Sequence, residues 1–382
     1  MVFTKIFKWR KIKMKKIQVL KPYYRIDECL QQIKECLDIG WTGMGFKTVD
    51  FEEKWKEYTR LPYAHFLNSA TAGLHLAIKV LKEDNFWYDD DEIITTPFTF
   101  VSTNHAIKYE NLTPVFADID DSLNLNPDSV KDKITSRTRA IMFVGVGGNT
   151  ANLMNIIKLA KENNLKIILD ASHMTGSRIE NRHVGFDVDA SVFSFQAVKN
   201  LPTADSGMIC FSNKELDQKA RCLSWLGIDK DTFQRSNQGT YKWDYDVARV
   251  GYKYHGNSIM AALGLVGLKY VEEDNAYRNK LAEKYMLNFG NKIRYILHKE
   301  GSSRHIFQIV VENRDEVIDF LYNNGIYPGV HYKDNMQYKM YHGDFLENSQ
   351  YFSKRVLSLP LHLNLTLDDI DYISTKILEI VK

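Results

Sequence analysis

The segment Asn68-Ser69-Ala70-Thr71 combines small and polar residues between an expected strand, 64–67, and an expected helix, 71–82. The first N–H groups of a helix have no partner within the helix, and the helix dipole places partial positive charge beside them. Such a turn can therefore hold a phosphate group. An ordinary helix cap by Asn68 or Ser69 explains the same residues, and it is the commoner meaning of such a segment.

A carboxylate closes another apolar run. Asp170 ends the expected strand 166–170 and is followed by Ala171, Ser172 and His173. A carboxylate at the end of a strand can pair with a cationic ring nitrogen, a metal or a base. A turn or helix-capping aspartate is the commoner alternative.

A lysine follows a third apolar run. The sequence FSFQAVKN places Lys199 just beyond the expected strand 191–195. A lysine that loses water in a cleft becomes less basic, and its amine can then act as a nucleophile and form a Schiff base. Most lysines are solvated surface groups, so this segment alone does not establish catalysis.

Together the three segments fit pyridoxal 5'-phosphate (PLP). This cofactor needs an amine for its aldehyde, a carboxylate that keeps its pyridine nitrogen protonated, and an anion site for its phosphate. Lys199, Asp170 and the turn before the helix 71–82 supply one group each. Ligands of open α/β sheets collect at the carboxyl ends of the strands, where all three segments are expected. The sequence therefore predicts a PLP site at that edge.

The elements that position these residues form an α/β pattern. Short apolar or β-branched runs alternate with amphipathic stretches, which predicts βαβ units, a wound α/β fold and a mainly parallel sheet. Helices are expected over 71–82 and 154–163, and strands over 64–67, 91–96, 113–119, 140–146, 166–170, 191–195 and 207–211.

The pattern changes after about residue 254. A long apolar helical stretch, 257–271, leads into a charged helix, and the chain ends in another helical pattern. Between them lie an expected strand, 305–311, an expected helix, 314–324, and the segment GIYPGVHY, 325–332. We therefore expect a basic, disordered leader over 1–17, a large cofactor-binding domain over 18–254 and a smaller C-terminal α/β domain over 255–382.

Composition excludes several classes of protein. The 382 residues are 44% hydrophobic and 26% charged, which is typical of a packed globular chain with one large or two unequal domains. Lys and Arg number 50 and Asp and Glu 48, so the net charge of +2 (50 − 48) gives no reason to expect binding to nucleic acid.

The four cysteines form no metal-binding pattern. Cys29, Cys36, Cys210 and Cys222 contain no CxxC pair, so we expect free thiols and neither a metal site nor disulfides. No run of 18 apolar residues and no secretory core is present, which favours the cytoplasm and no membrane partner. Two alternatives stay open for the basic leader. It could contact anionic lipid or nucleic acid, or the true start of the protein could be Met14.

From about residue 18 to residue 382 the chain resembles the DegT/DnrJ/EryC1/StrS family of PLP-dependent sugar aminotransferases. Several segments match the family in order, and FSF..VK after the DA.H strand is the most specific of them. The segments are GWTGMGFKTVDFEEKW (40–55), LNSATAGLHLA (67–77), TTPFTFVSTNHAI (95–107), PVFADID (114–120), ILDASHMTGS (168–177), VFSFQAVKNL (192–201), GYKYHGNSIMAALGL (251–265) and LSLPLHLNLTLDDIDYI (357–373). The resemblance implies the fold-type I architecture of aspartate aminotransferase, with a large wound-sheet domain and a smaller C-terminal domain.

The resemblance also implies roles for single residues. Lys199 takes the position of the catalytic lysine that bears the cofactor, and Asp170 that of the partner of the pyridine nitrogen. Phe100 corresponds to an aromatic residue stacked on the cofactor ring, and simple core packing is the less favoured alternative for this position. The remaining correspondences are His173 near the ring hydroxyl, Ser194, Ala70 and Thr71 at the phosphate, and His331 near the sugar, where a surface or structural histidine is the alternative.

The resemblance implies the reaction as well. Related sugar 3-dehydratases carry a histidine in place of the lysine, so Lys199 favours amino transfer from L-glutamate to a keto-deoxy sugar carried on a nucleotide. The product would be an amino sugar for a surface glycan. The alternatives are a PLP-dependent dehydratase or eliminating enzyme, and a catalytically silent binding protein with the same fold.

Three positions depart from the family pattern. The usual HLYG segment is Gly145-Val146-Gly147-Gly148 here, which puts the contacts to substrate in question. Ser206-Gly207 replaces a pair of glycines. Lys253 stands where many members have an asparagine that reaches the phosphate in the neighbouring subunit, and an ammonium group can also bind an anion. We therefore expect a homodimer with shared active sites.

Overall fold

The computed structural model describes residues 16–228 and 245–381. The predicted leader lies outside these residues except for its end. Buried Ile17 begins β1 (Ile17–Gln18), which pairs in parallel with β13 (Ile326–Tyr327). The fold therefore already includes the last residue of the predicted leader.

The large sheet has seven strands in the order β2-β10-β9-β6-β5-β3-β4. Four neighbouring pairs, β3–β4, β3–β5, β5–β6 and β6–β9, are parallel, whereas β10 runs antiparallel to both β2 and β9. This confirms the predicted mainly parallel α/β sheet. The bounds are β2 (His65–Leu67), β3 (Glu92–Thr95), β4 (Thr113–Phe116), β5 (Thr138–Val144), β6 (Lys166–Asp170), β9 (Ala190–Ser194) and β10 (Gly207–Phe211).

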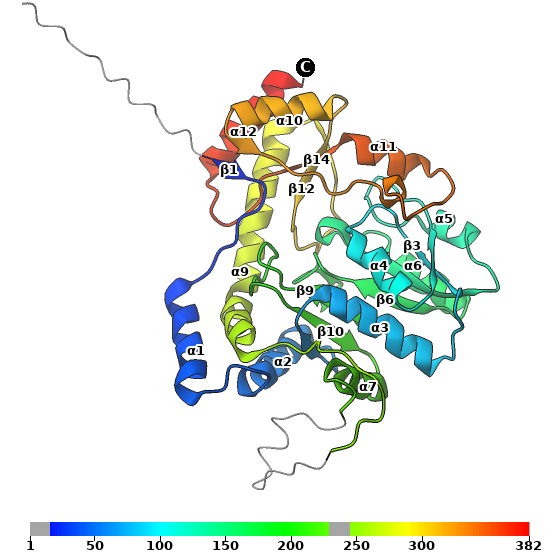
Figure 1. Ribbon diagram of the computed structural model, residues 1–382. Helices are drawn as coiled ribbons and strands as arrows, with labels where there is room; N and C mark the ends of the chain where they lie inside the picture. The colour runs from blue at the N-terminus through cyan, green and yellow to red at the C-terminus, as the bar shows by residue number, and fades with distance from the viewer. Residues whose placement is uncertain (1–15, 229–244, 382) are drawn as a thin grey trace, which may run out of the picture.

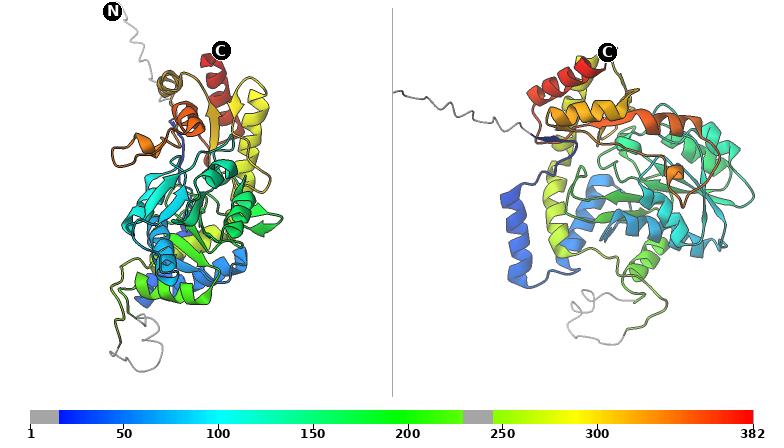
Figure 2. Two further views of the ribbon diagram at one scale, coloured as in Figure 1. Left: turned by 90° about the vertical axis from the view of Figure 1, so that its right-hand side faces the viewer. Right: turned by 45° about the horizontal axis from the view of Figure 1, so that its top comes forward.

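Both faces of this sheet are buried under helices, as Figure 1 and Figure 2 show. Side chains alternate along a strand, so Ile168 of β6 joins one core while Ile167 and Leu169 join the core on the opposite face. The first core lies under α3 (Ala70–Asp84), α4 (Val101–Tyr109) and α7 (Lys214–Ser224). The second lies under α2 (Phe46–Thr59), α5 (Pro127–Asp132), α6 (Leu153–Glu162) and the start of α9 (Ser258–Phe289). Burial on both faces explains why these strands are continuous apolar runs in the sequence.

The C-terminal part builds a core of its own. A three-stranded antiparallel sheet, β11-β12-β14, packs with the second half of α9, and Leu281 and Phe289 of that helix are buried there with Ile17. The further elements of this part and their bounds are β11 (Arg294–Tyr295), β12 (Phe307–Val310), α10 (Arg314–Asn323), η2 (Asn335–Gln337), α11 (Glu347–Arg355), β14 (Val356–Leu359) and α12 (Leu367–Ile380).

The long helix α9 is a single element of 32 residues, so the predicted apolar stretch and the charged stretch after it form one helix. It contacts α1 (Ile26–Ile39) and α2 in its first part and α12 in its second part. Among the described residues, no helix has the length and apolar character needed to cross a membrane. The remaining short elements are η1 (Val146–Gly148), β7 (Arg178–Ile179) and β8 (Arg182–His183).

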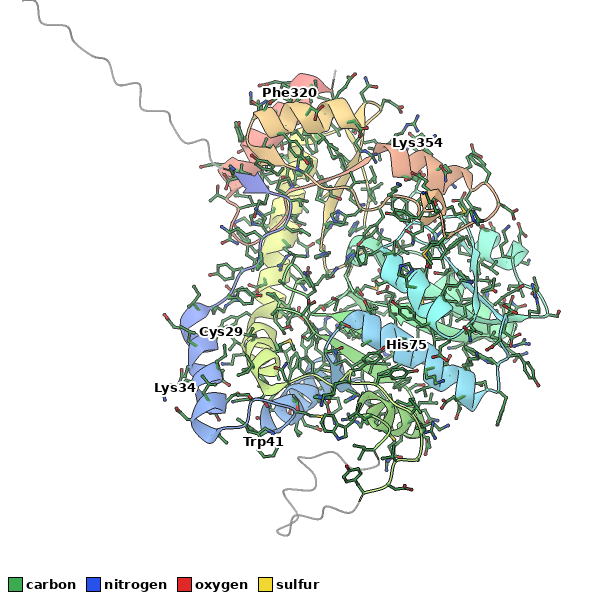
Figure 3. The ribbon with its side chains drawn as sticks, viewed as in Figure 1. Cys29, Lys34, Trp41, His75, Phe320 and Lys354 are labelled. Atoms are coloured by element: carbon green, nitrogen blue, oxygen red, sulfur yellow. The ribbon has the colours of Figure 1, made fainter. Side chains whose placement is uncertain are left out.

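The four cysteines are free thiols, as predicted. Figure 3 shows Cys29 on the side of α1 that faces α9, whereas Lys34 lies on the outer side of the same helix. Cys29, Cys36 and Cys210 are buried. They pack as small apolar groups in the helix and strand interfaces.

Candidate active site

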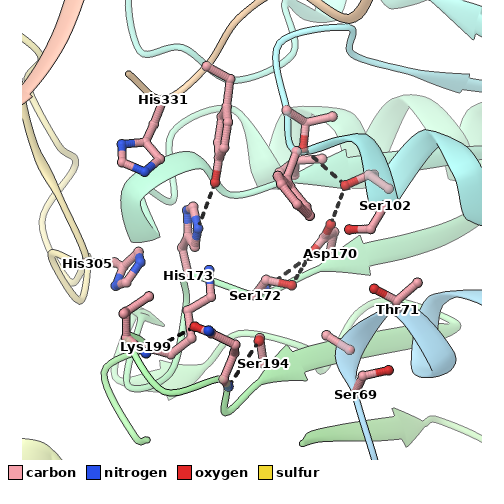
Figure 4. Close-up of a pocket in the computed structure, with 18 of the residues that line it drawn as sticks. Ser69, Thr71, Ser102, Asp170, Ser172, His173, Ser194, Lys199, His305 and His331 are labelled. Carbon is pink, nitrogen blue, oxygen red and sulfur yellow. Dashed lines mark hydrogen bonds between the residues drawn. The ribbon is translucent and has the colours of Figure 1, made fainter. Parts of the chain in front are cut away.

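A cavity of about 390 Å³ opens at the carboxyl ends of β6 and β9, beside the first turn of α3. The large sheet supplies its floor, and the C-terminal part supplies His305, His331 and Tyr332 to its wall. Figure 4 shows these groups converging on one space. Segments more than a hundred residues apart in the chain therefore meet at the edge where the sequence predicts a site.

Asp170 is a buried carboxylate on the cavity floor. One oxygen accepts hydrogen bonds from the backbone N–H of Ser172 at 3.1 Å and from its hydroxyl at 2.6 Å. The other accepts from the Thr103 hydroxyl at 2.7 Å. A carboxylate offers about four acceptor positions, so these bonds fix its orientation and leave one position for a further donor in the cavity.

Lys199 lines the same cavity and is half-buried rather than a fully solvated lysine. Burial lowers the pKa of Lys199 from 10.5 to about 8, and the nearby charge of Asp170 acts in the opposite direction. The ammonium form loses more by desolvation than the neutral amine does, which is the cause of the shift. Near neutral pH a usable fraction of this side chain is therefore the nucleophilic amine.

Aromatic packing holds the strand that leads to Lys199. Trp55 of α2 is fully buried, and its ring lies 5.0 Å from Phe193 and 5.1 Å from Phe195 in edge-to-face contacts. Beyond the strand, the N–H of Lys199 donates to the carbonyl of Gln196 at 2.8 Å, which closes a tight turn. The rigid strand and the turn together present the lysine to the cavity.

The first turn of α3 lies across the cavity from this loop. Ser69 caps the helix by accepting a hydrogen bond from Ala72 N–H at 3.1 Å, so the predicted cap is present. Ser69, Ala70, Thr71 and buried Ser194 also line the cavity. The capping interpretation is therefore confirmed, and the same turn lies at the cavity where the sequence predicts a phosphate site.

Gly207 of β10 allows this close approach. A methyl group at its Cα would stand 2.6 Å from the backbone nitrogen of Ala70 and 2.8 Å from the carbonyl carbon of Ser69. Only glycine lets the strand lie this near the helix terminus. The departure Ser206-Gly207 thus keeps the glycine that the geometry needs.

Phe100 is not a core residue. It precedes α4 and lines the cavity with 61% of its surface exposed, which makes the core-packing alternative wrong. Its ring is free to stack on a planar ligand bound above Asp170.

His173 is buried and neutral in the cavity wall. Its Nδ1 accepts from Gly147 N–H at 3.1 Å, so Nε2 carries the hydrogen that faces the Tyr332 hydroxyl at 3.0 Å. Burial, followed by the charge of Lys199, holds the pKa of His173 well below its usual range. Gly147 has a φ of +66°, a conformation that residues with side chains rarely adopt, so glycine suits the position from which this backbone N–H donates to His173.

Of the last two predicted residues, His331 and Lys253, only His331 lines the cavity. His331 lines the cavity, its Nδ1 lies 2.9 Å from the Ser358 hydroxyl, and burial lowers its pKa to about 4. Lys253 does not line the cavity of its own chain. Its ammonium lies 3.7 Å from the ring centre of Trp225.

Several cavity residues were not predicted. Ser172 lies two residues after the predicted Asp170, and Tyr332 directly follows the predicted His331. Proximity in sequence to a predicted site residue could therefore have identified both. Thr103 and His305 carry no such sign, because only the tertiary fold brings α4 and the segment before β12 to the cavity.

The donor set fits PLP. Asp170 keeps one acceptor position for a protonated ring nitrogen, Lys199 supplies an amine of lowered pKa, and the α3 turn with Ser194 supplies donors for a phosphate. When bound, the cofactor supplies an electron-withdrawing ring that stabilises negative charge on a substrate carbon.

Comparisons with known proteins agree with this geometry. The family model "DegT/DnrJ/EryC1/StrS aminotransferase family" matches residues 24–378. The spore coat polysaccharide biosynthesis protein SpsC of Bacillus subtilis is 34% identical over 93% of this chain and 95% of its own. An uncharacterized protein of Methanocaldococcus jannaschii, MJ1066, is 33% identical over 90% of this chain and 92% of its own.

Solved structures show the same architecture. PseC of Helicobacter pylori, an aminotransferase involved in the biosynthesis of pseudoaminic acid, superposes with a TM-score of 0.89 at 29% identity, covering 96% of this chain and 99% of its own. Spr1654 of Streptococcus pneumoniae, solved in its PLP form, gives 0.88 at 26% identity, with 96% and 100% covered. The fold is thus that of a fold-type I PLP enzyme, and the chain belongs to the PLP-dependent DegT/DnrJ/EryC1/StrS aminotransferase family.

Proposed function

We propose that this aminotransferase moves the amino group of L-glutamate to a keto-deoxy sugar linked to a nucleotide (dTDP, UDP or GDP) in the cytoplasm. The product is an amino sugar for a surface glycan. SpsC is a spore coat polysaccharide biosynthesis protein and PseC is an aminotransferase involved in the biosynthesis of pseudoaminic acid, and both relatives support a sugar acceptor.

One observation carries the proposal: Lys199 and Asp170 share one cavity with the α3 turn. In this assignment Lys199 holds the cofactor and moves the proton in each half-reaction, because its lowered pKa lets it serve as acid and as base near neutral pH. Asp170 holds the ring nitrogen protonated. The remaining assignments are Phe100 stacking on the ring, His173 beside the ring hydroxyl, Ala70, Thr71 and Ser194 at the phosphate, and His331 toward the sugar.

The half-reaction with glutamate tests the donor. Incubation of the PLP-loaded enzyme with L-glutamate alone should convert the cofactor spectrum to the pyridoxamine form and release one 2-oxoglutarate per site. ¹⁵N-glutamate together with a panel of keto-sugar nucleotides should then give a ¹⁵N-labelled amino sugar. A deoxygenated sugar without the label would support the dehydratase instead, and an unchanged spectrum would support a silent binding protein.

We also propose a homodimer in which Lys253 contributes to the cofactor phosphate site of its partner subunit. Lys253 does not line its own cavity, while the family resemblance places it at a position that reaches the neighbouring subunit. Phe100 at the cavity mouth is 61% exposed, so the site is open on one side.

Mixing two inactive variants tests the shared site. Lys199→Ala and Lys253→Ala chains, unfolded and refolded together, would form mixed dimers with one complete site of two. Activity should return to about a quarter of the wild-type value, since half of the dimers are mixed. No recovery, with mixed dimers present by mass spectrometry, would place Lys253 outside the partner's site.

A further inference from the structure

The tautomer of His305 is fixed by a chain of buried amides. Asn200 donates from Nδ2 to the carbonyl of Ser303 at 3.1 Å and to Oδ1 of Asn275 at 2.7 Å, and Asn275 donates to the carbonyl of Thr175 at 3.0 Å. Carbonyl oxygens only accept, so both amides have one possible orientation. Oδ1 of Asn200 therefore accepts from Nδ1 of His305 at 2.9 Å, which leaves Nε2 of a neutral ring as an acceptor.

This acceptor belongs to the cavity wall beside Lys199. His305 is buried and lines the cavity, and its ring centre lies 4.4 Å from that of His173. Figure 4 shows it on the same side of the cavity as Lys199. Both ring nitrogens of His173 are already bonded, to Gly147 and Tyr332. Within the part of the chain that the structure describes, Nε2 of His305 has no hydrogen-bond partner.

Burial keeps His305 neutral. Burial first, then the interactions with Lys199, Arg278 and His331, hold the pKa of His305 well below its usual range. The titratable groups that line the cavity with Lys199 come from four segments of the chain and are Asp170 and His173, Asp205, His305, and His331 with Tyr332. The cavity therefore holds a neutral histidine with a free lone pair and a lysine amine for which no hydrogen-bond partner is found among the described residues.

We propose that His305 is a positioning residue: when the cofactor occupies the cavity in its pyridoxamine form, and the ε-amino group of Lys199 is therefore free, Nε2 of His305 accepts a hydrogen from that amine. Asn200, the residue after the lysine, holds the ring in the accepting tautomer, so the lysine loop orients its own acceptor. The inference rests on the proposed role of Lys199. It has a measurable consequence: a hydrogen bond to the ammonium form opposes the effect of burial, so its loss should lower the pKa of Lys199 further.

Reductive methylation of the full chain loaded with pyridoxamine 5'-phosphate tests this, since the lysine amine is free in that form. The rate at Lys199, measured by peptide mass spectrometry against pH, is divided by the rate at exposed Lys269 in the same sample. The pH at which the methylation rate of Lys199 is half its maximum is the midpoint. In His305→Phe this midpoint should fall by about one pKa unit, which is a tenfold rise in the rate at a pH below both midpoints. In His305→Gln, whose amide can donate to Asn200 and accept from Lys199, the midpoint should return toward the wild-type value.

Two controls separate positioning from a structural role. His183 is also buried but does not line the cavity, so His183→Gln should leave the midpoint unchanged. Melting temperatures of all variants show whether each one folds. An unchanged midpoint in a folded His305→Phe variant, or equal shifts in the Phe and Gln variants, would overturn the proposal. Failure of the proposed function would be recognised by a different result. Lys199 would then form no reducible adduct with PLP, while the midpoint of its methylation rate could still be measured.

Discussion

At the scale of single residues, two charges decide the chemistry of the cavity. Asp170 is oriented by three hydrogen bonds, and Lys199 is made less basic by burial. The sequence pointed to both, because Asp170 ends one strand and Lys199 comes shortly after another. It could not show how far Lys199 is shielded from water, which depends on His305, His331 and other residues far along the chain.

Asp170→Asn should lower kcat by about 10²-fold or more, because the amide keeps the shape of the carboxylate but cannot hold a positive ring nitrogen. The measurement is the rate of the glutamate half-reaction by stopped-flow absorbance, with the cofactor content determined in parallel. Thr103→Val, which removes one hydrogen bond to the same carboxylate, is the matched control and should cost clearly less. Wild-type rates in a fully loaded Asp170→Asn enzyme would contradict the assignment.

The capture of PLP by the cofactor-free chain should depend on pH through Lys199. Its pKa of about 8 lies below the ordinary 10.5, so the neutral amine is scarce below pH 8, half present there and dominant above it. The capture rate should therefore rise up to about pH 8 and level off. Asp170→Asn should move that midpoint lower, since the carboxylate charge raises the pKa of Lys199. A rate that keeps rising toward pH 10.5 would mean a solvated lysine.

At the scale of elements, strand ends set the positions of the site residues. The bounds predicted for β6 and β10 agree with the structure, since both are continuous apolar runs buried on two faces. The predicted strand 113–119 was too long, because β4 ends at Phe116. The predicted strand 305–311 was also too long, because β12 begins at Phe307 and leaves His305 in the cavity wall. Local pattern gives no information on where such a strand leaves the sheet to meet a ligand.

The contact between β10 and α3 can be tested at Gly207. Gly207→Ala places a methyl group 2.6 Å from the Ala70 nitrogen, so strand and helix must separate. We expect a loss of about 1–3 kcal/mol in the free energy of unfolding and weaker binding of PLP through its phosphate. Gly43→Ala, where a methyl group meets nothing within 4 Å, should change neither. Urea unfolding and PLP titration measure the two effects, and an unaltered Gly207→Ala protein would show that this contact is not needed.

At the scale of the whole molecule, the cavity exists because two packing units meet. We propose residues 18–254 and 255–382 as two domains, although α9 contributes Ala261 to a core of the large sheet and Leu281 to the C-terminal core. The sequence predicted both units and the floor of the cavity. The wall formed by His305 and Tyr332 depends on how the units join, which no local pattern encodes.

The most direct measurement is chemical trapping of the cofactor on the whole chain. The protein is loaded with PLP, reduced with borohydride, digested and sequenced by tandem mass spectrometry. A single phosphopyridoxyl group on Lys199, absent from Lys199→Ala, is the predicted result. An adduct on another lysine, or none in a protein that binds PLP, would contradict the account.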